Sequence, residues 1–340
     1  MDTNNLDDHS LQVMERKNMV DEDDFEYLNG NFQRGAFDRL QEMYLLGIPR
    51  IKHLGSGVIK PPSLHNFMIL VIVKCPSVKS LFVESIALCM VNLQCLRNCD
   101  CEMLEEIVSM NTEQNEDTQM LEFPKLQEII LHNLRNFESL RSESNKMSQP
   151  MFKQVTQPNL ELLTLNQLTS LDMRSLPKLV HITRIFPKDI CIFENLTELR
   201  VANCDNLRYL FSPLISNKLV ALNFLRVWRC EAIEEIIGRQ EEDDTSNIEI
   251  VEEGMTSRIV FPKLIDLRLY HLNRFKTIFS QNYELLFPSL EHLLIIHCPA
   301  MTKLSSRQQL SAPKLDKVQI EGEKYVDISN FLDAEGSIQI

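Results

Sequence analysis

The side chains with the clearest potential for chemistry are three closely spaced cysteines. Cys95, Cys99 and Cys101 lie within seven residues of one another, and thiolates are preferred ligands of zinc and related ions. However, no second cysteine or histidine pair at zinc spacing follows them. Cys101 also falls at a fixed position of a repeat described below. We therefore expect core and turn cysteines here rather than a metal site.

Motifs for catalysis and nucleotide binding are missing from the sequence. It contains neither G-x-x-x-x-G-K-[ST] nor G-x-G-x-x-G, and only nine glycines occur among 340 residues, which leaves little room for a phosphate-binding loop. The motifs H-E-x-x-H and G-x-S-x-G are absent too. The eight histidines are scattered without a nucleophile and an acid at any catalytic spacing. The sequence predicts a protein that is not an enzyme and has no cofactor.

Charge and hydrophobic runs exclude further classes of protein. The net charge of -13 argues against broad binding to phosphates, so no nucleic-acid partner is expected. Apolar runs such as residues 67–73 are much shorter than the roughly 20 residues of a membrane span. The acidic first thirty residues contain no signal-peptide core, and the nine cysteines form no compact framework. We expect a cytoplasmic or nucleo-cytoplasmic protein without a membrane span.

One repeat accounts for most of the apolar residues. Its clearest copy, L-x-x-L-x-I-x-x-C-x-x-M-x-x-L, runs from Leu290 to Leu304. The same frame, with Cys or Leu at the ninth position, starts at Phe67, Leu126, Leu196, Leu222 and Leu264. Less regular copies begin at Leu40 and Leu315. We expect about ten stacked units, since one unit cannot bury its own apolar edge.

The spacing within the repeat predicts its local structure. The alternating centre is typical of a strand with one buried face. After the cysteine position the apolar spacing becomes three, which favours a tight turn or 3₁₀-like return over another strand. The sequence therefore predicts an α/β leucine-rich-repeat solenoid (horseshoe) with a parallel β-sheet on its concave face and short helical, 3₁₀ or irregular returns.

A phenylalanine–proline pair precedes several repeats. Phe-Pro-x-Leu starts at Phe123, Phe261 and Phe287, with Ala-Pro-Lys-Leu at Ala312. We expect the proline to preset extended backbone before the strand without costing a ladder hydrogen bond. Two places fit the frame poorly. Asn98 stands where an aliphatic residue is expected, and residues 160–182 fit either one long repeat or two overlapping ones starting at Leu160 and Leu168.

Polar tracts divide the chain. We expect a polar, acidic N-terminal segment over residues 1–36, the solenoid over 37–325 and a tail over 326–340. Intervals between repeats are lengthened by polar insertions near 110–122, 141–157 and 238–258, which are predicted to loop out from a turn of the coil. The acidic residues of the last insertion suit either solvation or an acidic docking site.

Outward positions of the predicted sheet bring one set of side chains together. Equivalent slots of adjacent strands lie roughly 5 Å apart. The set comprises a ladder of three arginines, two aromatic residues in the next outward slot and three basic or imidazole residues one position later: Arg200, Arg226 and Arg268; Trp228 and Tyr270; Arg229, His271 and His297. Arg, Trp and Tyr are common interface anchors, so this set is a candidate partner-contact patch. The alternative is a chance alignment neutralised by carboxylates such as Glu198 and Asp266.

The cysteine-containing repeats and the Phe-Pro-x-Leu segments, with phrases such as NLTELRVANCDNLRYLF and FPSLEHLLIIHCPAMTKL, resemble the repeat region of plant coiled-coil nucleotide-binding leucine-rich-repeat disease-resistance proteins. The resemblance covers about residues 37–320. It implies a recognition module of plant innate immunity that senses a pathogen effector or a guarded host protein and restrains a nucleotide-binding domain, in cis or in trans. It carries over no nucleotide-binding residues, because the phosphate loop is missing. We expect a fragment, a truncated product or a degenerate paralogue.

Two other functions fit a repeat protein of this kind. One is an intracellular substrate adaptor of a ubiquitin ligase, or a general interaction scaffold. The adaptor needs an F-box-like helical segment, which residues 1–36 are too short and polar to supply. The other is an extracellular receptor, which needs a signal peptide, a membrane span and L-x-G-x-I-P turns. The sequence favours the immune recognition module.

Overall fold

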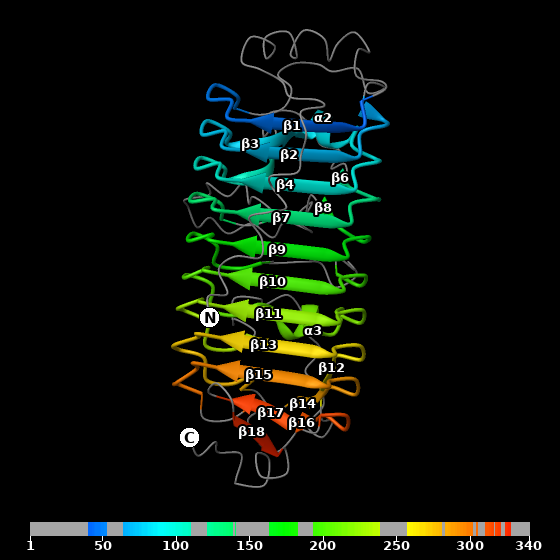
Figure 1. Cartoon of the computed structure of the whole chain (residues 1–340). Coiled ribbons are helices and arrows are strands. Elements are labelled where there is room, and N and C mark those ends of the chain that lie inside the picture. Colours follow the sequence, from blue (N-terminus) through cyan, green and yellow to red (C-terminus); the bar gives the residue numbers. More distant parts are fainter. Residues whose placement is uncertain are drawn as a thin grey trace, which may run out of the picture.

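The computed structural model describes residues 40–52, 64–109, 121–138, 140, 163–182, 193–238, 257–280, 283–301, 304, 310–315, 317–320 and 324–327. In these residues, eleven strands follow one another along the molecule in one sheet, the main sheet (Figure 1). Each strand pairs in parallel with the next, except the last, which is antiparallel. The main-sheet strands are β1 (Glu42–Leu46), β2 (Ile69–Val73), β4 (Cys95–Cys99), β7 (Glu128–His132), β9 (Ser170–Arg174), β10 (Glu198–Ala202), β11 (Phe224–Trp228), β13 (Asp266–Tyr270), β15 (His292–Ile296), β17 (Lys317–Ile320) and β18 (Lys324–Asp327).

The main-sheet strands follow the alternating pattern of the sequence. In β10, Leu199 and Val201 are fully buried, whereas Glu198 and Arg200 are partly exposed on the other face, called here the outer face. Neighbouring strands pair without slippage, so that Leu199 lies beside Leu225. Identical slots of successive repeats therefore form continuous columns, and the inner columns make one core. The fold is a leucine-rich-repeat solenoid, as predicted.

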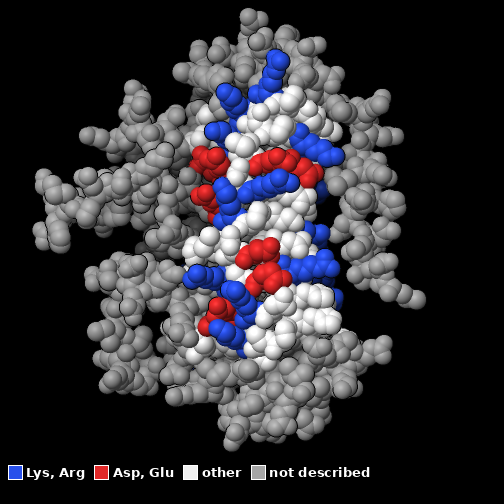
Figure 2. Space-filling model, turned by 90° about the vertical axis from the view of Figure 1, so that its left-hand side faces the viewer, with Lys and Arg blue, Asp and Glu red and all other residues white. Residues whose placement is uncertain are grey.

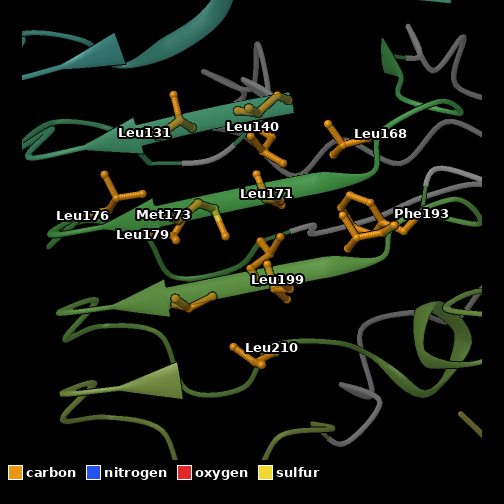
Figure 3. Close-up of a cluster of buried hydrophobic side chains, with 14 of the residues drawn as sticks. Leu131, Leu140, Leu168, Leu171, Met173, Leu176, Leu179, Phe193, Leu199 and Leu210 are labelled. Atoms are coloured by element: carbon orange, nitrogen blue, oxygen red, sulfur yellow. The ribbon is translucent and has the colours of Figure 1, made fainter. Parts of the chain in front are cut away.

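The core lies behind the main sheet. In Figure 3, Leu171 and Met173 of β9 and Leu199 of β10 pack with leucines of the following turns, such as Leu176 and Leu179. The phenylalanine of the phenylalanine–proline pairs also points into this core: Phe123, Phe261 and Phe287 are all buried. Large side chains from the turns thus fill the space between the main sheet and the returns.

The residue after each strand adopts a left-handed backbone conformation. Lys74, Asp100, Asn133, Ser175, Asn203, Arg229, His271 and His297 all have φ between 51° and 57°. Its N–H donates to the last carbonyl of the next strand, as from Asn203 to Trp228 at 3.1 Å and from His271 to Ile296 at 2.8 Å. This bond extends the ladder by one residue while the chain turns away. Gly47, at the same position after β1, has φ 68° and adopts this conformation without strain. Asn133, Asn203 and Asp100 are of residue types that also visit it readily.

The ninth position of the repeat lies inside this turn. Cys75, Cys101, Cys204 and Cys230 are fully buried. Their thiols point at the carbonyl two residues earlier, as from Cys204 to Ala202 at 3.3 Å. The small thiol therefore meets a backbone acceptor inside the turn, as the sequence predicts.

The prolines lie in turns, contrary to the expectation of an extended segment. The leucine of Phe-Pro-x-Leu donates its N–H to the phenylalanine carbonyl, at 3.1 Å from Leu126 to Phe123. Pro124 is thus the second residue of a four-residue turn, and β7 begins only at Glu128. The fixed φ of proline suits that turn position well, which explains the preference.

The returns contain more strand than the spacing of three predicted. In the described residues, short strands form three small parallel sheets behind the main sheet: β3 with β5, β6 with β8, and β12 with β14 and β16. Their bounds are β3 (Ser80–Val83), β5 (Glu106–Ser109), β6 (Leu121–Glu122), β8 (Leu163–Thr164), β12 (Ser257–Val260), β14 (Tyr283–Leu286) and β16 (Leu310–Ser311). The one-turn helices α2 (Glu84–Ala87) and α3 (Pro213–Ser216) also lie in returns. Stacking aligns the returns as well as the strands, so short runs of their backbone can pair.

Several boundaries predicted from the sequence fall within strands of the structure. The insertions near 110–122, 141–157 and 238–258 lie mostly outside the described residues, but the first ends within β6 and the third within β12. Their last residues therefore pair with neighbouring returns instead of looping out. The N-terminal segment 1–36 lies outside the described residues. The solenoid reaches at least Asp327, because β18 closes the main sheet and includes the first two residues of the predicted tail.

The structure shows how the two segments that fitted the repeat poorly are arranged. Leu168, Leu171 and Met173 are buried in one repeat, and β9 pairs with β7 and β10 in the common register. The repeat thus starts at Leu168. Asn98 lies in the inner column of β4 between Ile72 and Leu131 and is 0% exposed. Neither polar atom of its side chain has a hydrogen-bond partner in the described part of the chain.

Candidate interaction surface on the outer face

The predicted arginine ladder exists. Arg200 of β10 lies beside Arg226 of β11, which lies beside Arg268 of β13. All three side chains are partly exposed on the outer face. In the next outward slot Trp228 lies beside Tyr270. The constant register of the main sheet therefore brings these five predicted residues together on three adjacent strands.

The other three predicted residues lie at the end of the strands. Arg229, His271 and His297 occupy the left-handed position and are exposed. The rings of His271 and His297 stack with centroids 4.6 Å apart. Partial burial lowers the pKa of His271, and the positive charges of His297 and Arg229 lower it further. These residues thus form a border of the ladder, along the side of the molecule where the strands end.

That side carries no single basic field in the described residues. Figure 2 views the solenoid from the side where the strands end, and basic and acidic side chains lie next to one another along its length. One contact between opposite charges agrees with this mixture: Lys276 pairs with Glu234 at 2.6 Å. Long-range attraction of an acidic partner by this side is therefore weak, and specificity must come from individual side chains.

Two arginines of the ladder are neutralised within their own strand. Arg200 pairs with Glu198 at 2.7 Å, and Arg268 pairs with Asp266 at 2.6 Å. In each case the carboxylate lies two residues earlier on the same face. The alternative raised from the sequence, neutralisation by these carboxylates, is therefore correct for Arg200 and Arg268. Pairing with Asp266 raises the pKa of Arg268, although burial opposes this effect.

Arg226 departs from this arrangement. The residue two positions earlier is Phe224, and no carboxylate lies within ion-pairing distance of Arg226 among the described residues. Its Nε is buried without a hydrogen-bond partner in that part of the chain. The flanking guanidiniums of Arg200 and Arg268 are engaged elsewhere. Within the described strands, Arg226 is thus the member of the ladder whose charge is uncompensated.

A second charged group, which was not predicted from the sequence, adjoins the ladder. Asp172 of β9 is only 5% exposed. It accepts from His132 at 3.1 Å and from Arg174 at 2.7 Å, and Arg200 lies 3.8 Å away. Burial raises the pKa of Asp172, but the hydrogen bonds from His132 and Arg174 outweigh it and hold the pKa below its usual value. The sequence signal was available, because Asp172 and Arg174 show the same i, i+2 spacing as Glu198 and Arg200.

Arg174 also fixes the aromatic part of the surface. Its guanidinium carbon lies 5.2 Å from the ring centroid of Trp228, a cation–π distance. Arg174 occupies the same outward column as Trp228, two strands away. The indole is therefore held on the outer face by a side chain that is itself fixed by Asp172. Such fixed side chains are typical of a contact surface that is already formed before a partner binds.

The cysteines are arranged for packing. Cys95 and Cys99 face the outer side of β4, whereas Cys101 lies inside the turn. The Cys95 thiol donates to Glu128 at 3.0 Å, and burial is the main cause that raises its pKa to about 12. Burial likewise raises the pKa of Cys99 to about 11. In the part of the chain that the structure describes, no three His, Cys, Asp or Glu side chains gather as metal ligands do, and no helix there has the length and hydrophobicity to cross a membrane.

Comparison with known proteins relates one segment of the chain to a family of repeats. The family model of plant disease resistance protein RPS2-like leucine-rich repeats matches residues 141–231. The matched segment includes β9, β10 and β11, and therefore Arg200, Arg226 and Trp228. No solved structure matches the chain. Repeats of this kind mediate protein–protein interactions, and over this segment the chain is similar to the leucine-rich repeats of plant disease-resistance proteins.

Proposed function

We propose that this chain is a protein-recognition module of plant innate immunity, and that it contacts its partner through the outer face of β10, β11 and β13. The observation that carries the proposal is the register that places Arg226, Trp228 and Tyr270 on neighbouring strands of a rigid sheet. Arg, Trp and Tyr are the residue types that dominate binding energy in interfaces. The match to disease-resistance repeats, which includes β10 and β11, supports the biological setting.

The module acts by binding rather than by catalysis. Its partner is a protein: a pathogen effector, a guarded host protein, or a nucleotide-binding domain held inactive in cis or in trans. With such partners the module acts in the cytoplasm, or in both the nucleus and the cytoplasm. The buried Asp172 and the cation–π contact of Arg174 hold the surface in one arrangement before binding, and such preorganisation lowers the entropic cost of association.

Proximity labelling in plant leaves tests this function. The full chain is fused to a biotin ligase and compared with the double variant Arg226→Ala/Trp228→Ala and with Lys263→Ala, a control on an exposed turn before β13. We expect proteins labelled by the wild type to be labelled equally by the control and at least about tenfold less by the double variant, because truncating two anchors costs about 2 kcal/mol or more, which is about thirtyfold or more in affinity. A defence-marker assay in the same leaves reports whether the lost partners act in immunity.

Stability of the variants separates a contact role from a structural one. The double variant should unfold within about 0.5–1 kcal/mol of the wild type, because both side chains are partly exposed. Leu225→Ala, which removes a fully packed side chain on the inner face of the same strand, should cost about 2–5 kcal/mol. Equal losses in both variants would make Arg226 and Trp228 structural. Labelling of ubiquitin-ligase subunits that is insensitive to the double variant would support the substrate-adaptor function instead.

A further inference from the structure

One strand of the outer face breaks a rule that its neighbours keep. In β10 and β13, the two neighbours of β11, an arginine is paired with the carboxylate two residues earlier, at 2.7 Å for Arg200 and 2.6 Å for Arg268. Strand β9 shows the same spacing one outward slot later, with Arg174 paired at 2.7 Å with Asp172. Strand β11 keeps the arginine, Arg226, but carries Phe224 at the position of the carboxylate. The exception lies in the middle of the ladder, between two guanidiniums whose carboxylate partners are already engaged.

From this exception we infer that Arg226 binds a carboxylate supplied by the partner. The occupant is an Asp or Glu side chain of a protein segment that places a large apolar side chain next to the acid. This inference rests on the proposed function, since it names the chemistry that the same surface recognises. The incoming carboxylate takes the place that Glu198 and Asp266 have in the neighbouring strands, and it accepts hydrogen bonds from the guanidinium.

The surroundings of Arg226 strengthen such an ion pair. Phe224 and Trp228 flank it on the same face of β11, and both are partly buried. Apolar walls that exclude water lower the local dielectric, and a charge-assisted hydrogen bond there is stronger than one in open solvent. The buried Nε shows that part of the desolvation is already present in the free protein. Binding therefore does not have to remove water from the whole guanidinium.

The apolar part of the occupant has a defined place. Trp228 lies beside Tyr270, and Arg174 holds its indole from the other side. On the opposite side of Arg226, Phe224 lies between Glu198 and Asp266. A second acid on that side would meet two carboxylates. The surface thus selects one acid at Arg226 and an aliphatic or aromatic side chain toward Trp228 and Tyr270, rather than a run of acids.

Selection of short random peptides displayed on phage against the full chain tests the inference. We expect enrichment of peptides with a single Asp or Glu next to a large apolar residue. In fluorescence anisotropy, changing that acid to its amide should weaken binding about 10- to 100-fold, the size of a charge-assisted hydrogen bond. Arg226→Gln should weaken the same peptides equally, and acid-to-amide change should have no further effect in that variant.

The chain offers a matched variant that restores the rule. Phe224→Glu recreates the Glu-Leu-Arg sequence of β10 within β11, so the new carboxylate should pair with Arg226 and abolish peptide binding. Because Glu198 and Asp266 flank this position, some loss of stability is expected, and circular dichroism checks that the fold is retained. Lys263→Ala, on the exposed turn before β13, is the control, and it should change affinity less than about threefold. Two outcomes overturn the inference: selected peptides without an essential acid, or binding that survives both Arg226→Gln and Phe224→Glu.

Two further outcomes have defined meanings. If phosphoserine in place of the essential acid binds at least tenfold more tightly, the site recognises phosphorylated partners and the carboxylate inference is wrong. If leaf labelling depends on Arg226 and Trp228 but the selected peptides do not, the recognition function stands and the inference about its chemistry fails. If the peptides depend on Arg226 but the leaf labelling does not, the carboxylate site is real and the proposed function fails.

Discussion

Replacing the buried amide of Asn98 by an alkyl group of the same branching should stabilise the protein. Asn98 is 0% exposed, and within the described residues neither Oδ1 nor Nδ2 has a hydrogen-bond partner. The equivalent inner position holds Ile72 on one side and Leu131 on the other. The change Asn98→Leu keeps the fork of the side chain and gives this slot the residue type of its neighbour in β7.

The size of the effect follows from the burial. An amide taken out of water without a hydrogen bond costs about 1–3 kcal/mol on the scale of protein mutations. Leucine removes that cost and buries apolar surface instead, so we expect a gain of about 1–3 kcal/mol in the free energy of unfolding. With a urea m value of about 3 kcal/mol/M, the midpoint should rise by about 0.3–1 M.

Urea unfolding followed by circular dichroism measures this change, and hydrogen exchange of the β4 amides shows whether it is local. Asn98→Asp is the matched control, because it keeps the shape but buries a charge, and it should lower the midpoint. An unchanged or lower midpoint for Asn98→Leu, at unchanged m, would refute the reasoning. It would mean that the amide of Asn98 is satisfied in the folded protein.

Three other predictions use the same repeats. Lys74→Val should cost about 1–2 kcal/mol in urea unfolding, because Lys74 has φ 55° and β-branched residues are strained there, whereas Lys74→Gly should not; equal midpoints would remove the strain argument. The pKa of Asp172 is lower in the folded protein than its ordinary value of 3.8. The ionised carboxylate therefore contributes its full stabilisation above pH 3.8 and loses it as the pH falls through the lower folded pKa. Asp172→Asn should show a shallower loss of stability than the wild type between about pH 4 and pH 2, and identical profiles would contradict this. Cys95 and Cys99, with pKa values raised to about 12 and about 11, should react with iodoacetamide at pH 7.5 far more slowly than a free thiol, as peptide mapping would show; fast labelling of either would contradict the burial effect.

The strands and their register could be predicted from the sequence because the repeat has a hard constraint. A slip by one residue would turn Leu199 and Val201 to the outer face, and the alternation allows only one frame. The same frame aligns Arg200 with Arg226 and Arg268, so the ladder too was predictable from the sequence alone. The start of the repeat at Leu168 was ambiguous because Leu160 fits the same spacing, and only the pairing of β9 with β7 decides between them.

Conformations set by neighbouring repeats left only a partial signal in the sequence. The left-handed residue after the strand is Asn, Asp or His at five repeats, which are types enriched in this conformation, but Lys, Ser or Arg at three others, so the residue type alone does not mark it. Its conformation is imposed by the N–H that bonds the next strand's last carbonyl. The short return strands were not predictable for a related reason. They pair because the solenoid stacks them, and a spacing of three does not predict a strand by itself.

The carboxylate–arginine pairs depend on a spacing of two residues along one strand, whereas the arginine ladder depends on the alignment of one slot across successive repeats. Asp172 and Arg174 lie two residues apart, so the alternation of a strand puts them on one face. That i, i+2 spacing is visible in the sequence, and so is the exception at Phe224. The consequence of the exception is not visible in the sequence, because it depends on whether a neighbouring strand offers Arg226 a carboxylate. In the described residues none does, and the Nε stays without a partner there.

Asn98 and Phe224 both depart from the repeat, and the face of the sheet decides what each departure does. Asn98 points inward, where its amide is buried and finds no partner among the described residues, so its effect is a loss of stability. Phe224 points outward, where the missing carboxylate leaves Arg226 able to bind one from another molecule. A repeat protein makes this contrast testable. The neighbouring strands hold the ordinary residue at each position, so Asn98→Leu should raise stability without affecting binding, and Phe224→Glu should abolish binding while the fold is retained.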